Sequence, residues 1–147
     1  RRMPQDQQEH WHHIQRKIAR HVVAGQRFCR NIPGYFKLDI QDRISLGKNV
    51  GFGLMVLIAC TEFYDPEFKR FKHIWNWTMP MQNPLFSYKL HLLSLGDKMH
   101  EIQVDRTEAS MMCAISMTSI DCPGLLKPKI VCDIRDALIV ALQAHIS

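Results

Sequence analysis

The chain has 147 residues, of which 46% are hydrophobic and 22% are charged, so it is long and apolar enough for one domain with a sizeable core. No run approaches the 18 consecutive apolar residues of a membrane helix, and no basic start precedes an apolar stretch, so we expect neither a membrane segment nor a secretory signal. The five cysteines include no C-x-x-C pair, which argues against a disulfide framework or a zinc site and favours a reducing compartment.

The first predicted element is a long amphipathic helix that ends at Pro33 and Gly34. Its apolar positions recur at steps of three or four residues, the period of one helix face: Trp11, Ile14, Ile18, Val22, Gly25, Cys29 and Ile32. The positive charge is concentrated here, because residues 1–50 hold ten Lys and Arg against four Asp and Glu. Since most basic residues fall off the apolar stripe and no binding motif accompanies them, the pattern favours a solvated helix face over a direct nucleic-acid contact.

A second helix is predicted from Ile40 to about Phe63. It is apolar nearly all round, which is typical of a central, buried helix. Residues 64–84 are irregular and rich in proline and tryptophan. There we expect a loop packed by its aromatic residues, or a short hairpin built from Phe68, Phe71, Ile74 and Trp75.

Three further helices follow in the predicted order. Residues 85–102 have helical periodicity, with Gly96 on the exposed side. Asp105 and Glu108 have the spacing of a capping box for the next helix, which we expect to run to Pro123 and Gly124. Pro128 suits the first turn of a last helix. The chain is therefore predicted to be all-α and layered, with at most one small β-hairpin.

The sequence gives little support for catalysis or metal binding. The first helix carries four histidines: His10, His12, His13 and His21. His10 and His13 have a spacing that can chelate a metal, with Glu9 nearby, but a polar helix face is the favoured interpretation. No G-x-S-x-G, P-loop, G-x-G-x-x-G or H-E-x-x-H motif is present. Cys29 near His21 lies on a packed helix, where a buried thiol is inert. We expect no catalytic residue, no metal site and no enzyme.

Three stretches resemble one family. Phe28-Cys29-Arg30-Asn31-Ile32-Pro33-Gly34-Tyr35 is similar to the "(F/W)AK-x-(I/V)PGF" that ends helix 3 of nuclear-receptor ligand-binding domains. The run from Leu38 to Lys48 is similar to the "L-x-x-x-DQ-x-x-LLK" that opens helix 4, and Asp121-Cys122-Pro123-Gly124-Leu125 is similar to the "DRPGL" after helix 8. Arg43, Gly47 and Cys122 depart from these patterns.

The resemblance implies a layered helical sandwich in which residues 1–147 run from helix 3 to helix 9 and stop there. The main dimer face on helices 10 and 11 and the activation helix 12 would then lie outside the sequence. Within the family the resemblance favours the Rev-erb and ecdysone-induced group, which lacks helix 12, with a divergent, nematode-type receptor fitting the departures. The peroxisome-proliferator-activated type resembles the sequence nearly as well.

The same resemblance implies a groove that binds a coregulator helix. Its walls would be Val22, Val23, Gln26, Arg30, Tyr35, Arg43, Ile44, Gly47 and Lys48. Arg30 stands at the family's clamp lysine, where a cation meets the carbonyls at a bound helix's C-terminus. Basic groups on the rim and a groove widened at Gly47 favour a partner with acidic flanks or a longer, corepressor-type helix. The implied role is a nuclear, repressive transcription-factor domain with a nuclear-receptor dimer partner, whose DNA contacts lie in a separate zinc-finger domain.

Two alternatives stay open. The domain could be a sensor in which a lipid or haem in the helical interior gates partner choice, with a pocket lined by methionines, chiefly Met55, Met99 and Met112, beside Met111 and Met117. In the Rev-erb group the haem ligands lie upstream of helix 3 and on helix 11, outside this sequence, so we expect no haem in this fragment; haem in a full receptor stays open. The second alternative is a dimerisation scaffold with a collapsed pocket.

Overall fold

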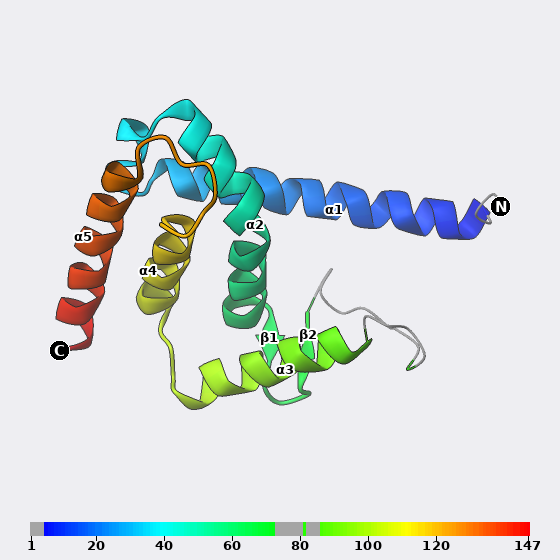
Figure 1. Ribbon diagram of the computed structural model, residues 1–147. Helices are drawn as coiled ribbons and strands as arrows, with labels where there is room; N and C mark the ends of the chain where they lie inside the picture. Colours follow the sequence, from blue (N-terminus) through cyan, green and yellow to red (C-terminus); the bar gives the residue numbers. More distant parts are fainter. Residues whose placement is uncertain (1–4, 73–80, 82–85) are drawn as a thin grey trace.

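The computed structural model describes residues 5–72, 81 and 86–147 (Figure 1). The helices are α1 (Gln5–Arg30), α2 (Ile40–Glu62), α3 (Phe86–Glu101), α4 (Arg106–Met117) and α5 (Pro128–Ile146), with a short 3-10 turn, η1, over Tyr35–Lys37. The strands β1 (Tyr64–Asp65) and β2 (Arg70–Phe71) form an antiparallel hairpin in which Tyr64 pairs with Phe71. The prediction of an all-α domain with one small hairpin is confirmed.

Helix α2 lies at the centre of the arrangement. It packs against α1, α3 and α4, and α4 packs in turn against α5. Figure 1 shows α2, α4 and α5 side by side as one layer, with α1 crossing one end of α2 and α3 crossing the other. The N-terminal half of α1 extends away from this layer.

The corner between α1 and α2 is fixed by Gly34. This residue has a φ of 84°, which side chains rarely adopt, and an added Cβ would lie 3.2 Å from Cγ1 of Ile134 on α5. Asp39 then caps α2, because its side chain accepts a hydrogen bond of 2.9 Å from the Gln41 amide. The tight corner brings the end of α1 against the start of α2.

Two apolar clusters hold the layers together. The first joins α1, α2, α4 and α5 and contains Cys29, Ile32, Leu38, Leu46, Leu54, Cys113, Ala114, Met117, Cys122, Val131 and Ile134. The second joins α2, the hairpin and α3 and contains Ala59, Cys60, Tyr64, Phe71, Leu92 and Met99. Four of the five cysteines are buried within these clusters. Burial raises the pKa of both Cys60 and Cys113 to about 11, so neither thiol is reactive at neutral pH.

Three sequence-based expectations need correction. Gly96 is buried and not exposed, because the Tyr64 ring packs directly over it. Helix α4 ends at Met117, short of Pro123, because the Thr118 amide turns back to the Ile115 carbonyl. In the hairpin region, Phe68 lies in the turn between the strands, while Ile74 and Trp75 fall outside the described residues.

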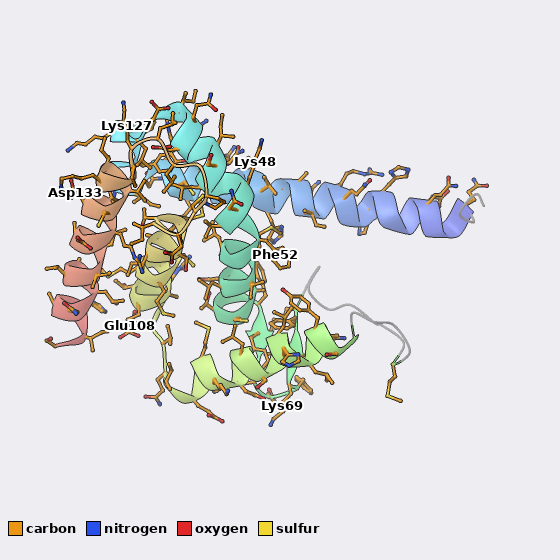
Figure 2. The ribbon with its side chains drawn as sticks, in the orientation of Figure 1. Lys48, Phe52, Lys69, Glu108, Lys127 and Asp133 are labelled. Carbon is orange, nitrogen blue, oxygen red and sulfur yellow. The ribbon has the colours of Figure 1, made fainter. Side chains whose placement is uncertain are left out.

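The expectation about membrane segments also changes. By length and composition α2 could cross a membrane, with a mean hydropathy of 1.5 over its best window, of which 22% is buried. The central helix of a folded domain meets the same criteria, and α2 contacts three other helices. Its low burial shows that α2 is not covered on all sides: Lys48 and Phe52 project from one exposed side (Figure 2).

Candidate functional site

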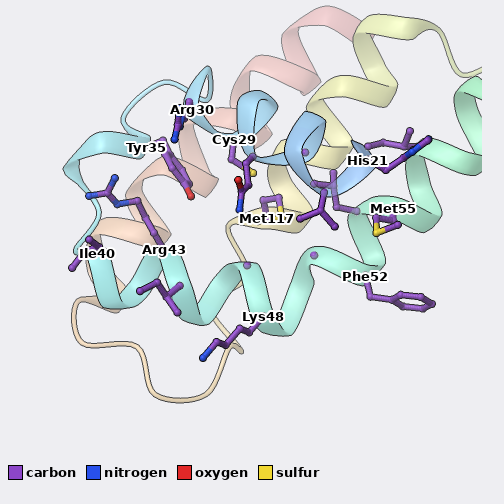
Figure 3. Close-up of a pocket in the computed structure, with 18 residues that line it drawn as sticks. His21, Cys29, Arg30, Tyr35, Ile40, Arg43, Lys48, Phe52, Met55 and Met117 are labelled. Carbon is purple, nitrogen blue, oxygen red and sulfur yellow. The ribbon is translucent and has the colours of Figure 1, made fainter. Parts of the chain in front are cut away.

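A cleft of about 590 Å³ lies between the C-terminal half of α1 and the first part of α2 (Figure 3). Tyr35 of η1 and Met117 of α4 complete its walls. Arg30, Tyr35 and Arg43 lie at one end, and His21 and Met55 lie at the other. An elongated, partly apolar cleft between two helices has the shape that an amphipathic partner helix requires.

Eight of the nine groove residues predicted from the sequence line this cleft: Val22, Gln26, Arg30, Tyr35, Arg43, Ile44, Gly47 and Lys48. The ninth, Val23, is 47% exposed on α1 and is not among the lining residues. A helix turns by about 100° per residue, which carries Val23 away from the face that Val22 presents to the cleft.

The structure adds lining residues that were missed: His21, Gly25, Cys29, Ile40, Gly51, Phe52, Leu54, Met55, Ile58 and Met117. Helical spacing could have found several of them. On α2, Ile40, Ile44, Gly47 and Gly51 follow one another at steps of four, three and four residues. Met117 belongs to a distant helix, and only the packing of α4 against α2 brings it here.

The floor of the cleft is apolar and buried, whereas its rim is apolar and exposed. Leu54, Cys29 and Met117 are almost fully buried at the floor. At the rim Ile40 and Phe52 are 60% and 62% exposed. Gathered apolar side chains that face solvent are characteristic of protein-binding surfaces. Burial also raises the pKa of the Cys29 thiol, so this cysteine serves the floor and not chemistry.

The charges of the cleft are all positive. Arg30, Arg43 and Lys48 line it, and no acidic side chain of the described residues does so. The Arg43 guanidinium lies 5.8 Å from the Tyr35 ring centroid and 6.0 Å from that of Phe36, a cation–π arrangement that holds it at the rim. Its Nε is buried without a hydrogen-bond partner among the described residues. Burial raises the pKa of Tyr35. The nearby Cys29 raises this pKa further, whereas the positive charges of Arg43 and Arg30 lower it. The cleft therefore favours an anionic or hydrogen-bond-accepting ligand.

The three methionines predicted for a ligand pocket gather at the second apolar cluster. Met99 is buried in the second apolar cluster, and Met55 and Met112 pack against it. Met55 also lines the cleft. This arrangement fits methionines that fill core space.

One group of described residues has ligand atoms close enough for a metal: Asp105, Glu108 and His145, all within 4.8 Å of one another. The same atoms already have partners, because the predicted capping box is confirmed. Oδ1 of Asp105 accepts from the Glu108 amide at 2.7 Å, and Oε2 of Glu108 accepts from the Asp105 amide at 2.9 Å. His145 Nε2 lies 3.1 Å from the other Asp105 oxygen and links the end of α5 to the start of α4. Of the pair considered for metal binding, His13 is exposed on α1, and the side chain of His10 lies outside the described residues.

The Asp105 carboxyl of this capping box should have a lowered pKa. The Glu108 amide, followed by His145, lowers the pKa of Asp105 below its ordinary value of 3.8. A lowered folded-state pKa means that Asp105 stabilises the fold fully above pH 3.8 and that this contribution is lost as the pH falls through the lower value. We expect a carbon-detected NMR titration to give a midpoint below 3.8 for Asp105, and His145→Ala to move it part of the way back. A midpoint at or above 3.8 would contradict the capping geometry.

Comparison with known proteins places the chain near one group. No protein-family model matches it. It is 26% identical over 139 residues to retinoic acid receptor gamma of Xenopus laevis, and the aligned region covers 92% of this chain and 29% of that protein. It is 28% identical over 132 residues to peroxisome proliferator-activated receptor gamma of Xenopus laevis, and the aligned region covers 81% of this chain and 26% of that protein.

The chain thus spans less than a third of the length of these curated relatives. Both relatives are nuclear receptors, and neither distinguishes the Rev-erb and ecdysone-induced group within the family. The helical fold agrees with the same relationship. Together, the fold and these similarities support a nuclear-receptor ligand-binding domain at the level of the family.

Proposed function

We propose that residues 1–147 form the coregulator-docking part of a nuclear-receptor ligand-binding domain, spanning the family's helices 3 to 9. The observation that carries this proposal is the cleft between α1 and α2, with its buried apolar floor, its exposed apolar rim and the positive charges of Arg30, Arg43 and Lys48. The relatives are receptors and not enzymes, which supports a binding role. The protein would act in the nucleus, with DNA contacted through a separate zinc-finger domain and with a nuclear-receptor dimer partner.

Arg30 has the central role in this proposal. The C-terminal carbonyls of a bound helix lack partners within the helix and carry partial negative charge. Arg30, exposed at one end of the cleft, can donate hydrogen bonds to them. Arg43 and Lys48 would meet acidic flanks of the same helix. Space around Gly47, where an added Cβ would meet no atom within 4 Å, favours a longer helix of the corepressor type and hence a repressor of the Rev-erb group.

The test is peptide binding by fluorescence anisotropy. We expect a corepressor-type helix to bind more tightly than a coactivator-type LxxLL helix. Arg30→Glu should weaken that binding at least about tenfold, because it replaces an attractive contact by repulsion from the helix C-terminus. Lys98→Glu, an exposed change on α3 far from the cleft, is the matched control and should bind normally.

Each other outcome removes part of the proposal. If neither peptide binds the wild-type chain, the cleft is not a docking groove. If only the LxxLL helix binds, the repressor assignment fails while the groove stands. If Lys98→Glu weakens binding as much as Arg30→Glu does, net charge and not the clamp accounts for the affinity.

A lipid or haem sensor is the second candidate. A cavity of about 230 Å³ lies between α1, α2 and α4, lined by Phe28, Leu54, Ile58, Thr61, Glu62, Arg106, Ala109, Ser110 and Cys113. This volume is below the roughly 300–1,000 Å³ of ordinary ligand sites, so it gives the sensor weaker support than the cleft gives docking. A rise in melting temperature of delipidated protein on adding a fatty acid or haem would favour the sensor.

A further inference from the structure

A row of arginines runs along α1, beside the cleft and beyond its His21 end. Arg16, Arg20, Arg27 and Arg30 are all exposed and are spaced by four, seven and three residues, which places them on one side of the helix. At 1.5 Å per residue the row is about 21 Å long. Arg30 is at once the last member of this row and part of the cleft wall.

The charge of this row is not balanced locally. None of the four guanidinium groups makes an ion pair with an acidic side chain of the described residues. The sequence contains no Asp or Glu from residue 10 to residue 38. Four like charges on one side of a helix repel one another, so a matching anionic partner would gain from every contact.

We propose that this row binds an acidic segment of the same partner whose helix docks in the cleft, immediately following that helix. The inference rests on the proposed docking function. With its C-terminus at Arg30 the docked helix runs parallel to α1, because His21 lies at the other end of the cleft. The following segment therefore turns back at Arg30 and runs along α1 toward Arg16. An extended chain covers about 3.3 Å per residue, so six or seven residues beyond this turn would span the row. Carboxylates are the matching groups, because the arginine fork binds them with two parallel hydrogen bonds.

The experiment compares four fluorescent peptides by anisotropy on the same chain. They are the docking helix alone, the helix followed by a Gly-Asn turn and seven residues rich in Asp and Glu, the same extension at its N-terminus, and a C-terminal extension of the same turn with seven Ser and Gln residues. The variant is Arg16→Glu with Arg20→Glu, and Arg16→Lys with Arg20→Lys is its charge-preserving control. Both positions changed are exposed, so circular dichroism should show unchanged helix content.

We expect the C-terminal acidic extension to tighten binding by about three- to tenfold at low salt, as a few exposed ion pairs do, with the gain shrinking at high salt. The double glutamate variant should abolish this gain and leave binding of the unextended helix unchanged. The double lysine variant should keep most of the gain.

Several results would overturn the inference. They are no gain from the C-terminal acidic extension, an equal gain from the N-terminal or the neutral extension, or a gain that survives the double glutamate variant. Displacement of the extended peptide by a DNA duplex at lower concentration than the free acidic peptide would instead assign the row to nucleic acid. If the unextended helix does not bind at all, the docking function itself has failed, which is a separate and distinguishable result.

Discussion

Replacing Asp42 with alanine is expected to lower the free energy of unfolding by about 3 kcal/mol. Asp42 is fully buried in the first turn of α2. Its two carboxylate oxygens accept hydrogen bonds from the backbone amides of Leu126 and Lys127, at 2.6 Å and 2.9 Å. Without the carboxylate, both amides lose a charged acceptor, and the loop before α5 loses its connection to α2.

Two other variants separate this effect from a general loss of charge. Asp42→Asn keeps one acceptor oxygen but places an amide NH₂ where the second acceptor was, so it should cost about half as much. Asp133→Ala removes an exposed carboxylate that forms a surface ion pair with Lys129 at 3.0 Å, and should change stability by less than about 0.5 kcal/mol. Urea denaturation followed by circular dichroism measures all three. Equal losses for Asp42→Ala and Asp133→Ala would contradict the structural role of Asp42.

The second large effect is expected at Gly96. A Cβ at this position would lie 2.7 Å from Cγ and Cδ2 of the Tyr64 ring, which is closer than real Cβ atoms approach. The ring cannot easily move away, because it packs against Phe71 and its hydroxyl donates a hydrogen bond to Oδ1 of Asp97. Gly96→Ala should therefore destabilise the domain by about 2 kcal/mol, although alanine in general favours a helix over glycine.

The control is another helical glycine with free space. Gly53 on α2 has no atom within 4 Å of an added Cβ, so Gly53→Ala should stabilise the domain by about 0.5–1 kcal/mol. In a Tyr64→Ala background the clash is absent, and Gly96→Ala should become neutral or stabilising. Thermal unfolding of the four variants tests this, and a destabilisation by Gly96→Ala that persists without the Tyr64 ring would refute the packing argument.

The helices themselves could be predicted from the sequence because their signals are local. Spacing of apolar residues at three and four positions marks a helix face whatever surrounds it. The capping box at Asp105 and the proline at the start of α5 likewise depend only on residues within one turn. Eight of the predicted groove residues line the cleft together because they lie on two consecutive helices or on the short turn between them, so the chain itself keeps them close.

The tertiary structure alone decided what lies across from each face. Gly96 looked exposed because its own helix has an apolar stripe elsewhere, and only the hairpin brings Tyr64 onto it from more than thirty residues away. The two amides bound by Asp42 are also more than eighty residues distant in sequence. Met117 at the cleft floor and the open side of α2 follow from how α4 and α1 pack. The sequence determined the helices and their polar and apolar faces, because those rest on contacts within a few residues. Which faces are covered depends on contacts between distant segments, and these exist only once the chain has folded.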